Sequence, residues 1–333
     1  MSRKLITIST IMTLMSTSVI ADVPNVAADI APIHSLVSRV MDGVGAPKLI
    51  VQSGASPHGY RLRPSEAKAL QDADHVFWMG EELTPWLDSA IGTLASKASV
   101  TTLLDQQGVI LHDFREGALF EAHDHSAHGD DDHDDHDDHD DHDDHKDHDD
   151  DDDHDDHDDH DDHGSHDPHA WLSPENAKLW LNIIASKLSV SDPENAATYF
   201  MNAAAGQAEI EAMIAEVKAT LKPVQGGKFV VFHDAYQYFE NDFDFYASGA
   251  ISLSDSSDPS PARIEKVQKR IRDEGIQCVL AEPQFKKGLV ATVMEGSDAT
   301  ASVIDPLGTE LETGPKLYTQ LIENMAKTLR NCL

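Results

Sequence analysis

The sequence contains few long apolar runs, and only one of them stands out. Residues 5–20 are largely apolar, and Arg3 and Lys4 precede them. This run includes several Ser and Thr residues and is shorter than the roughly 20 apolar residues that span a bilayer. It therefore predicts a signal peptide over residues 1–21, export of the mature chain and no membrane insertion.

Cysteine is also scarce, since only Cys278 and Cys332 occur among the 333 residues. They do not form a CxxC pair, which argues against a cysteine-based metal site. In an exported protein, an even pair of cysteines instead predicts one disulfide bond. No HExxH motif is present either, so the sequence lacks this signature of a zinc hydrolase.

Basic residues are few, with 25 Lys and Arg against 60 Asp and Glu, for a formal net charge of −35. Most of the excess is local, because residues 123–167 hold 25 aspartates and one lysine. Nucleic acids and anionic lipid surfaces both attract basic proteins. The composition therefore argues against either as a partner.

Outside this acidic tract, apolar strand-like segments alternate with amphipathic helical ones, a pattern typical of parallel sheets covered by helices. We predict an α/β protein of two similar lobes, each a mostly parallel sheet flanked by helices. The predicted domains are a first lobe over residues 22–192, a linking helix over 193–222 and a second lobe over 223–333. The linking helix begins near Pro193 and contains one glycine, Gly206.

Residues 123–166 repeat aspartate and histidine and are predicted to form a disordered loop within the first lobe. Aspartate favours helices poorly, and like charges at helical spacing repel one another. Its imidazoles and carboxylates are expected to bind zinc weakly at many interchangeable places, as a collector or sensor; a solvated spacer is the alternative. The expected weak ligands are His123, His125, His128, His133, His136, His139, His142, His145, His148, His154, His157, His160, His163 and His166.

Three other histidines stand at predicted strand ends or loops, where open α/β sheets place their ligands. They are His58 in "GASPHGY", His169 in "DPHAW" and His233 in "VFHDAY". Three imidazoles suit Zn²⁺, Cu²⁺ or Ni²⁺ better than Mn²⁺ or Mg²⁺. Asp305 in "VIDPLG" is a candidate fourth ligand, and capping of its own turn is the equally plausible alternative.

The sequence resembles the periplasmic zinc-binding receptors of ABC importers, of the ZnuA type, over nearly the whole mature chain. The segments that carry the resemblance are "GASPHGYRLRPSEAKAL", "HVFWMGEELTPWL", "DPHAWLSPENA", "KFVVFHDAYQYF", "QCVLAEPQF" and "DPLG", in that order. The acidic His-rich insertion ahead of "DPHAW" is also a feature of zinc members. Manganese members place a glutamate where this chain has His233, so the resemblance favours zinc.

This resemblance implies a receptor with two lobes joined by one long helix, which binds Zn(II) in the cleft between them as its transported ligand. His58 and His169 would come from the first lobe and His233 from the second. Some zinc members carry a glutamate before the first histidine, where this chain has Pro57. The fourth ligand therefore stays open between Asp305, which matches the family's aspartate, and a water.

The resemblance further implies a periplasmic location, a monomeric receptor with no catalytic residue, and delivery to an inner-membrane ABC permease with its cytoplasmic ATPase. The Cys278–Cys332 pairing also matches a disulfide of some members. Two rival interpretations remain at this point. A zinc-dependent hydrolase would use three histidines and an open fourth position, and a metal buffer or adhesion protein would be built on the acidic tract.

Overall fold

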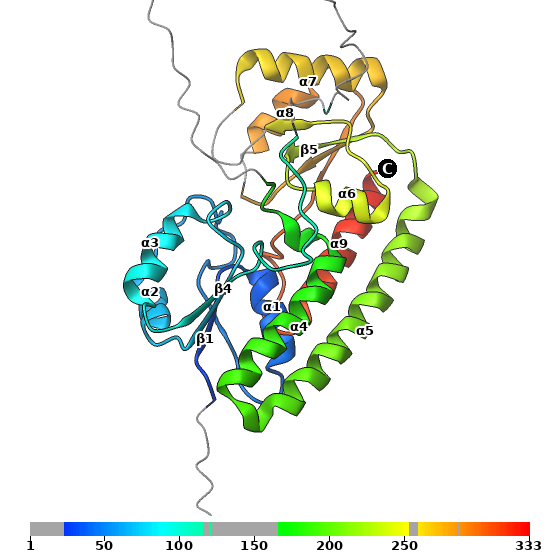
Figure 1. Ribbon diagram of the computed structural model, residues 1–333. Helices are drawn as coiled ribbons and strands as arrows, with labels where there is room; N and C mark the ends of the chain where they lie inside the picture. Colours follow the sequence, from blue (N-terminus) through cyan, green and yellow to red (C-terminus); the bar gives the residue numbers. More distant parts are fainter. Residues whose placement is uncertain (1–22, 116–119, 121–165, 253–258, 285–286) are drawn as a thin grey trace, which may run out of the picture.

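The computed structural model describes residues 23–115, 120, 166–252, 259–284 and 287–333. Within these ranges the chain forms two four-stranded parallel sheets flanked by helices, and one long helix runs beside both (Figure 1). The predicted fold class is therefore confirmed. The predicted signal peptide at residues 1–21 and residues 123–165 of the predicted disordered loop lie outside the described residues.

The first sheet has the strand order β2-β1-β3-β4. Strands and intervening helices alternate along the chain, as the sequence predicted. In chain order they are β1 (Val26–Ala28), α1 (Ala31–Val40), β2 (Lys48–Leu49), α2 (Pro64–Gln71), β3 (His75–Trp78), α3 (Pro85–Leu94) and β4 (Ser99–Thr102). All residues of β1 and β3 are buried because helices cover both faces of this sheet.

The second sheet repeats the same topology with the order β6-β5-β7-β8. Its elements are β5 (Phe229–His233), α6 (Gln237–Phe243), β6 (Ala250–Ser252), α7 (Pro261–Glu274), β7 (Cys278–Ala281), α8 (Lys287–Met294), β8 (Thr300–Val303) and α9 (Leu317–Cys332). In the first sheet β1 pairs with both β2 and β3, and in the second sheet β5 pairs with both β6 and β7. The carboxyl ends of the central strands therefore collect the loops that carry polar residues.

Two long helices, α4 (Pro174–Ser191) and α5 (Ala196–Leu221), connect the sheets. The sequence predicted that the linking helix starts at Pro193, but Pro193–Asn195 form a 3₁₀ turn and the α-helix begins at Ala196. Gly206 lies where α5 passes α4: a Cβ there would come within 3.0 Å of Leu181 Cδ1. The glycine inside this helix thus permits close helix packing.

The largest hydrophobic cluster includes residues of both sheets as well as helices α1, α4, α5 and α9. Helix α4 contributes Trp180 to this cluster and α5 contributes Tyr199, and both side chains are fully buried. Two smaller clusters lie on the outer faces, one under α2 and α3 and one under α7 and α8. The two halves of the molecule therefore share one continuous core.

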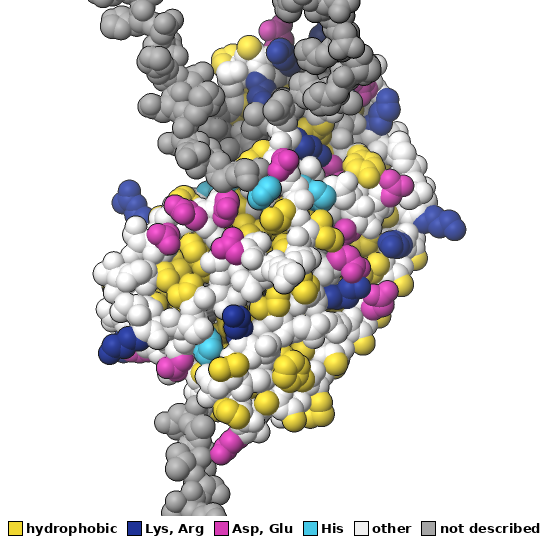
Figure 2. Space-filling model, in the orientation of Figure 1, with side chains coloured by type: hydrophobic (Ala, Val, Ile, Leu, Met, Phe, Trp, Pro, Cys, Tyr) yellow, Lys and Arg dark blue, Asp and Glu magenta, His cyan; other side chains and the backbone are white. Residues whose placement is uncertain are grey.

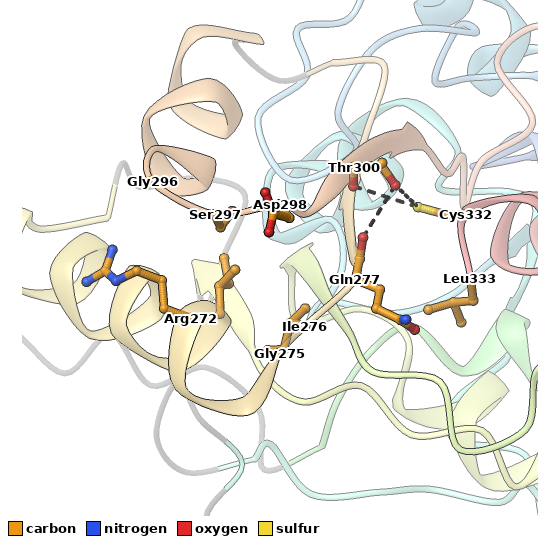
Figure 3. A pocket seen from close by; sticks show the side chains of 11 residues that line it. Arg272, Gly275, Ile276, Gln277, Gly296, Ser297, Asp298, Thr300, Cys332 and Leu333 are labelled. Carbon is orange, nitrogen blue, oxygen red and sulfur yellow. Dashed lines mark hydrogen bonds between the residues drawn. The ribbon is translucent and has the colours of Figure 1, made fainter.

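A disulfide bond joins Cys278, the first residue of β7, to Cys332, the last residue of α9. The predicted pairing is confirmed. Figure 3 shows Cys332 beside Thr300 and Gln277, lining a pocket with Arg272 and Asp298. This pocket lies at the edge of the second sheet where β7 and β8 begin, opposite the edge where β5 ends in His233.

None of the helices in the described parts of the chain has both the length and the apolar character needed to cross a membrane.

Candidate metal centre

Three histidines that are distant in sequence lie together in the structure. His233 is the last residue of β5, His58 lies in the loop between β2 and α2, and His169 immediately precedes the 3₁₀ turn Ala170–Leu172. The ring centroids of His58 and His169 are 5.6 Å apart, and those of His169 and His233 are 5.2 Å apart. The His169 and His233 Nε2 atoms are separated by 3.4 Å.

Two of these imidazoles are held by buried carboxylates. The His169 Nδ1 lies 2.6 Å from Asp167 Oδ1, and the His233 Nδ1 lies 2.6 Å from Glu282 Oε1. An imidazole that donates its Nδ1 proton to a carboxylate presents a lone pair at Nε2, the atom that binds metals in such carboxylate–histidine pairs. In this tautomer both Nε2 atoms are available to one cation.

Residues of the first lobe hold the loop that carries His58 in place. Trp86 of α3 donates its Nε1 hydrogen to the Pro57 carbonyl over 2.7 Å, and the His58 amide donates to Ser56 Oγ over 3.2 Å. Further along, Tyr60 donates to Glu66, which also caps the start of α2. Pro57 therefore contributes a carbonyl that anchors the loop.

Asp305, the candidate fourth ligand, caps its own turn. Its Oδ1 accepts hydrogen bonds from the amides of Leu307 and Gly308, each over 3.0 Å. Its Oδ2 accepts from the amide and the hydroxyl of Thr309 over 2.6 and 2.8 Å. A carboxylate has about four lone-pair directions, and this turn occupies four. The turn-capping interpretation therefore has direct support in the structure.

Across the described residues, no group of three or more His, Cys, Asp or Glu side chains is spaced to hold a single metal ion. The three imidazoles are thus neighbours whose rings do not yet converge on one point. Figure 2 shows a few histidine side chains (cyan) at the surface of this face, several of them near acidic side chains (magenta). His169 and His233 themselves are buried.

Several residues around the histidines were not assigned a role from the sequence. Asp167 and Glu282 orient two imidazoles, although both lie in the quoted segments "DPHAWLSPENA" and "QCVLAEPQF". Tyr236 is fully buried, and burial together with the charges of Glu282 and Asp305 raises its pKa well above the ordinary value. Its hydroxyl approaches Glu282 without a hydrogen bond of normal geometry. No local signal distinguishes such a tyrosine from a core residue.

The other histidines have separate settings. His166 of the acidic tract is 40% exposed at its side chain and directs Nδ1 to Asp113 Oδ1 over 2.9 Å. His34 and His75 are buried among first-lobe elements, and burial lowers the pKa of both. The remaining tract histidines, His123 to His163, lie outside the described residues, so their expected weak zinc binding stays a prediction.

Residues 26–332 match the protein family described as "Zinc-uptake complex component A periplasmic". This chain belongs to that family. The high-affinity zinc uptake system protein ZnuA of Brucella abortus (strain 2308) is 50% identical to it over 308 residues, which cover 92% of this chain and 91% of the relative. The protein of the same name from Paracoccus denitrificans (strain Pd 1222) is 46% identical over 314 residues, covering 94% and 93%.

A crystal structure of ZnuA aligns with the chain at a TM-score of 0.70 and 20% identity, covering 93% of this chain and 99% of the other. At that identity the likeness shows the shared fold. The zinc-uptake component A family comprises solute receptors rather than enzymes, as the sequence predicted. The family assignment does not favour the zinc-dependent hydrolase or the metal buffer and adhesion protein.

Proposed function

We propose that this protein binds Zn(II) with high affinity in the periplasm and delivers it to the permease of an ABC-type zinc importer. The observation that carries the proposal is the juxtaposition of His58, His169 and His233, two of them oriented by buried carboxylates, in a chain of the zinc-uptake component A family. The protein would be exported by its signal peptide, residues 1–21, and act as a monomer.

The three histidines would bind zinc through Nε2, and the short Nε2–Nε2 approach of His169 and His233 supports their sharing of one cation. Repulsion between these two lone pairs is relieved when a cation lies between them. We assign the fourth position to a water, because every lone-pair direction of Asp305 is used by its own turn. Asp305 as a direct ligand remains the alternative.

The His233→Ala substitution tests the ligand set. We expect the zinc dissociation constant of the tightest site to rise by at least about 100-fold, because one of three protein ligands is lost. Competition against a chelator of known affinity measures it, and His34→Ala serves as the control because His34 bonds to the Pro47 carbonyl within the first lobe. An unchanged dissociation constant in His233→Ala would remove His233 from the site.

The Asp305→Asn substitution separates the two candidates for the fourth position. If a water is the fourth ligand, zinc affinity changes little, while the turn formed by Asp305 loses some stability. If Asp305 is a ligand, affinity falls and X-ray absorption shows one oxygen fewer or a longer bond. The latter result would restore the direct assignment.

The acidic tract is proposed to collect zinc at weak sites and leave tight binding to the three histidines. A chain that orders itself around each ion loses conformational entropy, whereas a folded site does so much less. Calorimetric titration of a chain lacking residues 123–165 should retain one tight site and lose several weak ones. Loss of the tight site with the tract would reverse this assignment.

A further inference from the structure

Residues 110–115, which precede the acidic tract, pair with residues 166–173, which begin at its last histidine, and we call these two arms the root hairpin. Asp113 and His166 pair as an antiparallel bridge, and the Asp167 amide donates to the His112 carbonyl over 2.8 Å. His169 belongs to the second arm of this hairpin. The hairpin follows β4 of the first sheet, and Figure 1 shows the chain rising from β4 past α6 of the second lobe.

Tyr238, fully buried in α6, ties both arms of the root hairpin to the second lobe. Its hydroxyl donates to the Asp167 carbonyl over 2.7 Å and accepts from the His112 amide over 3.1 Å. The hydroxyl therefore bridges the two arms two residues before His169. Ser173, at the end of the second arm, donates to Asp242 over 2.7 Å and adds a second bond between this arm and the α6 region.

Arg115 forms a second connection between the first arm of the root hairpin and the second lobe. Its guanidinium binds Asp234 through Nε and Nη2, and it binds Glu240 through Nη1 over 2.6 Å. Asp234 directly follows His233, and Glu240 is buried in α6. Burial raises the pKa of both carboxyl groups, and the arginine lowers it. The Arg115 guanidinium thus connects the first arm of the root hairpin to Asp234, next to His233, and to helix α6.

The segment that contains His169 is consequently bonded to α6, the helix that follows His233, although the sequence assigns this segment to the first lobe. The indole of Trp171, two residues after His169, also donates to the Pro306 carbonyl of the second lobe over 2.8 Å. By contrast, the loop of His58 is anchored by Trp86 of α3 in the first lobe. The loop of His58 is therefore anchored on the side of the first lobe, and the segment of His169 is bonded to the second lobe.

We propose that Tyr238 and Arg115 are positioning residues that hold the segments next to His169 and His233 together through α6, so that these two histidines form a preassembled pair. His58 is then the ligand that completes the site when the lobes close and leaves first when zinc is released. This inference rests on the proposed zinc function and its three-histidine ligand set. The sequence groups His169 with His58, because both precede the linking helix. We instead group His169 with His233 and treat His58 as the separate ligand.

Zinc affinities of Tyr238→Phe in three backgrounds test this proposal. In the otherwise native full chain and in His58→Ala, Tyr238→Phe should raise the dissociation constant of the tightest site about 10-fold, the low end of the cost of losing an outer partner, because Tyr238 positions Asp167, which orients His169. In His169→Ala the same substitution should leave it unchanged, because the ligand that Tyr238 positions is already absent. A role of Tyr238 confined to stability would give the same effect in all three backgrounds.

Tyr199→Phe is the matched control, since it also removes a buried tyrosine hydroxyl, one that donates to Asp192 at the start of the linking helix. It should leave zinc affinity unchanged. Arg115→Met is a second variant, which keeps an unbranched side chain but removes the guanidinium, and it should raise the dissociation constant in the His58→Ala background. X-ray absorption of zinc-loaded His58→Ala should show two imidazole ligands.

Two outcomes would overturn the proposal: a penalty of Tyr238→Phe that persists in His169→Ala, or no penalty in either the native or the His58→Ala chain. Failure of the proposed function gives a different result. In that case His58→Ala, His169→Ala and His233→Ala would each bind zinc as tightly as the native chain, before any change at Tyr238 is made.

Discussion

At the scale of single residues, two buried carboxylates, Glu282 and Asp29, bind different kinds of group. Glu282 is fully buried, contacts His233 Nδ1 and accepts a hydrogen bond from Gln284 over 2.9 Å. Asp29 is equally buried directly after β1, where it accepts hydrogen bonds from the amides of Ile30 and Met79, each over 2.7 Å. The same chemical group thus orients an imidazole in one place and connects backbone segments in the other.

The Glu282→Gln substitution should weaken zinc binding by 10- to 100-fold, the cost typical of a lost outer partner of a metal ligand. The amide can still accept the His233 proton, but it removes the negative charge that makes the imidazole a stronger ligand. Chelator competition measures the effect, and Glu209→Gln on α5, which pairs with Arg39, is the control. Equal affinity in the two variants would show that Glu282 does not tune the site.

Asp29 predicts a pH dependence of stability. Burial raises its pKa from 3.8 to about 7, so between these values the native state holds a proton that the unfolded chain has lost. The free energy of unfolding therefore falls as the pH rises through this window. Relative to the native chain, Asp29→Asn should gain about 3 kcal/mol between pH 4.5 and 7.5, because the amide does not titrate.

Urea unfolding of both zinc-free chains at the two pH values measures this relative gain. A difference between native chain and variant that is constant with pH would show that Asp29 keeps its ordinary pKa in the fold.

At the scale of elements, helix α5 and the disulfide hold the second half of the molecule in place. The close passage of α5 over α4 depends on Gly206, and the Cys278–Cys332 bond fastens the end of α9 to the start of β7. His233 lies at the other end of the sheet, because Cys278 pairs with Phe229 at the start of β5. The disulfide therefore acts on stability at a distance from the histidines.

Replacement of both Cys278 and Cys332 by alanine should lower the free energy of unfolding by about 4 kcal/mol, the chain-entropy value for a closed loop of 54 residues. Zinc affinity should be unchanged. Denaturant unfolding and chelator competition on the same samples test both parts, and a large loss of affinity would show that the disulfide supports the metal centre.

A Gly206→Leu substitution should separate α4 from α5 and lower the free energy of unfolding by about 1–3 kcal/mol, the usual cost of overpacking. The crowded atoms belong to Leu181 and Arg39, which would have to move. Gly92→Leu in α3 is the control, since nothing lies within 4 Å of a Cβ at that position. Equal stability of the two variants would contradict the close packing.

At the scale of the whole molecule, the continuous core implies that the two sheets do not unfold separately. The cluster that includes Trp180 extends from the first sheet to the second through α1, α4, α5 and α9. All four tryptophans, Trp78, Trp86, Trp171 and Trp180, precede the linking helix. Three of these indoles bond to first-lobe groups and Trp171 bonds to Pro306, so their fluorescence reports mainly on the first half of the chain. Far-ultraviolet circular dichroism reports on all helices.

We expect the two signals to give one coincident unfolding transition, because a shared core couples the halves. Zinc at 100 times its dissociation constant should stabilise the native chain by about 2.7 kcal/mol in both signals. His233→Ala should lose this gain at the same zinc concentration. Two separate transitions would show that each half folds on its own.

The sequence by itself determined the alternation of strands and helices, the disulfide partners and the presence of histidines such as His58 and His233 at loops and strand ends. These features depend on hydrophobic periodicity, on residue counts and on neighbours along the chain, all of which are local. The segment resemblance likewise pointed to the zinc-uptake family. The exact start of the linking helix was missed by three residues because Pro193 begins a 3₁₀ turn as readily as an α-helix.

Only the tertiary structure decided which carboxylate orients which imidazole and that the residues beside His169 bond to the second half of the chain. Glu282 lies 49 residues from His233, and Arg115 lies 119 residues from Asp234. Such pairs form because packing of the two sheets and α6 brings them within hydrogen-bonding distance, and no periodicity along the chain encodes that distance. Asp305 differs, because its four hydrogen bonds come from residues only two to four positions further along the chain. Even so, only the folded turn showed that these bonds use all the lone-pair directions of its carboxylate.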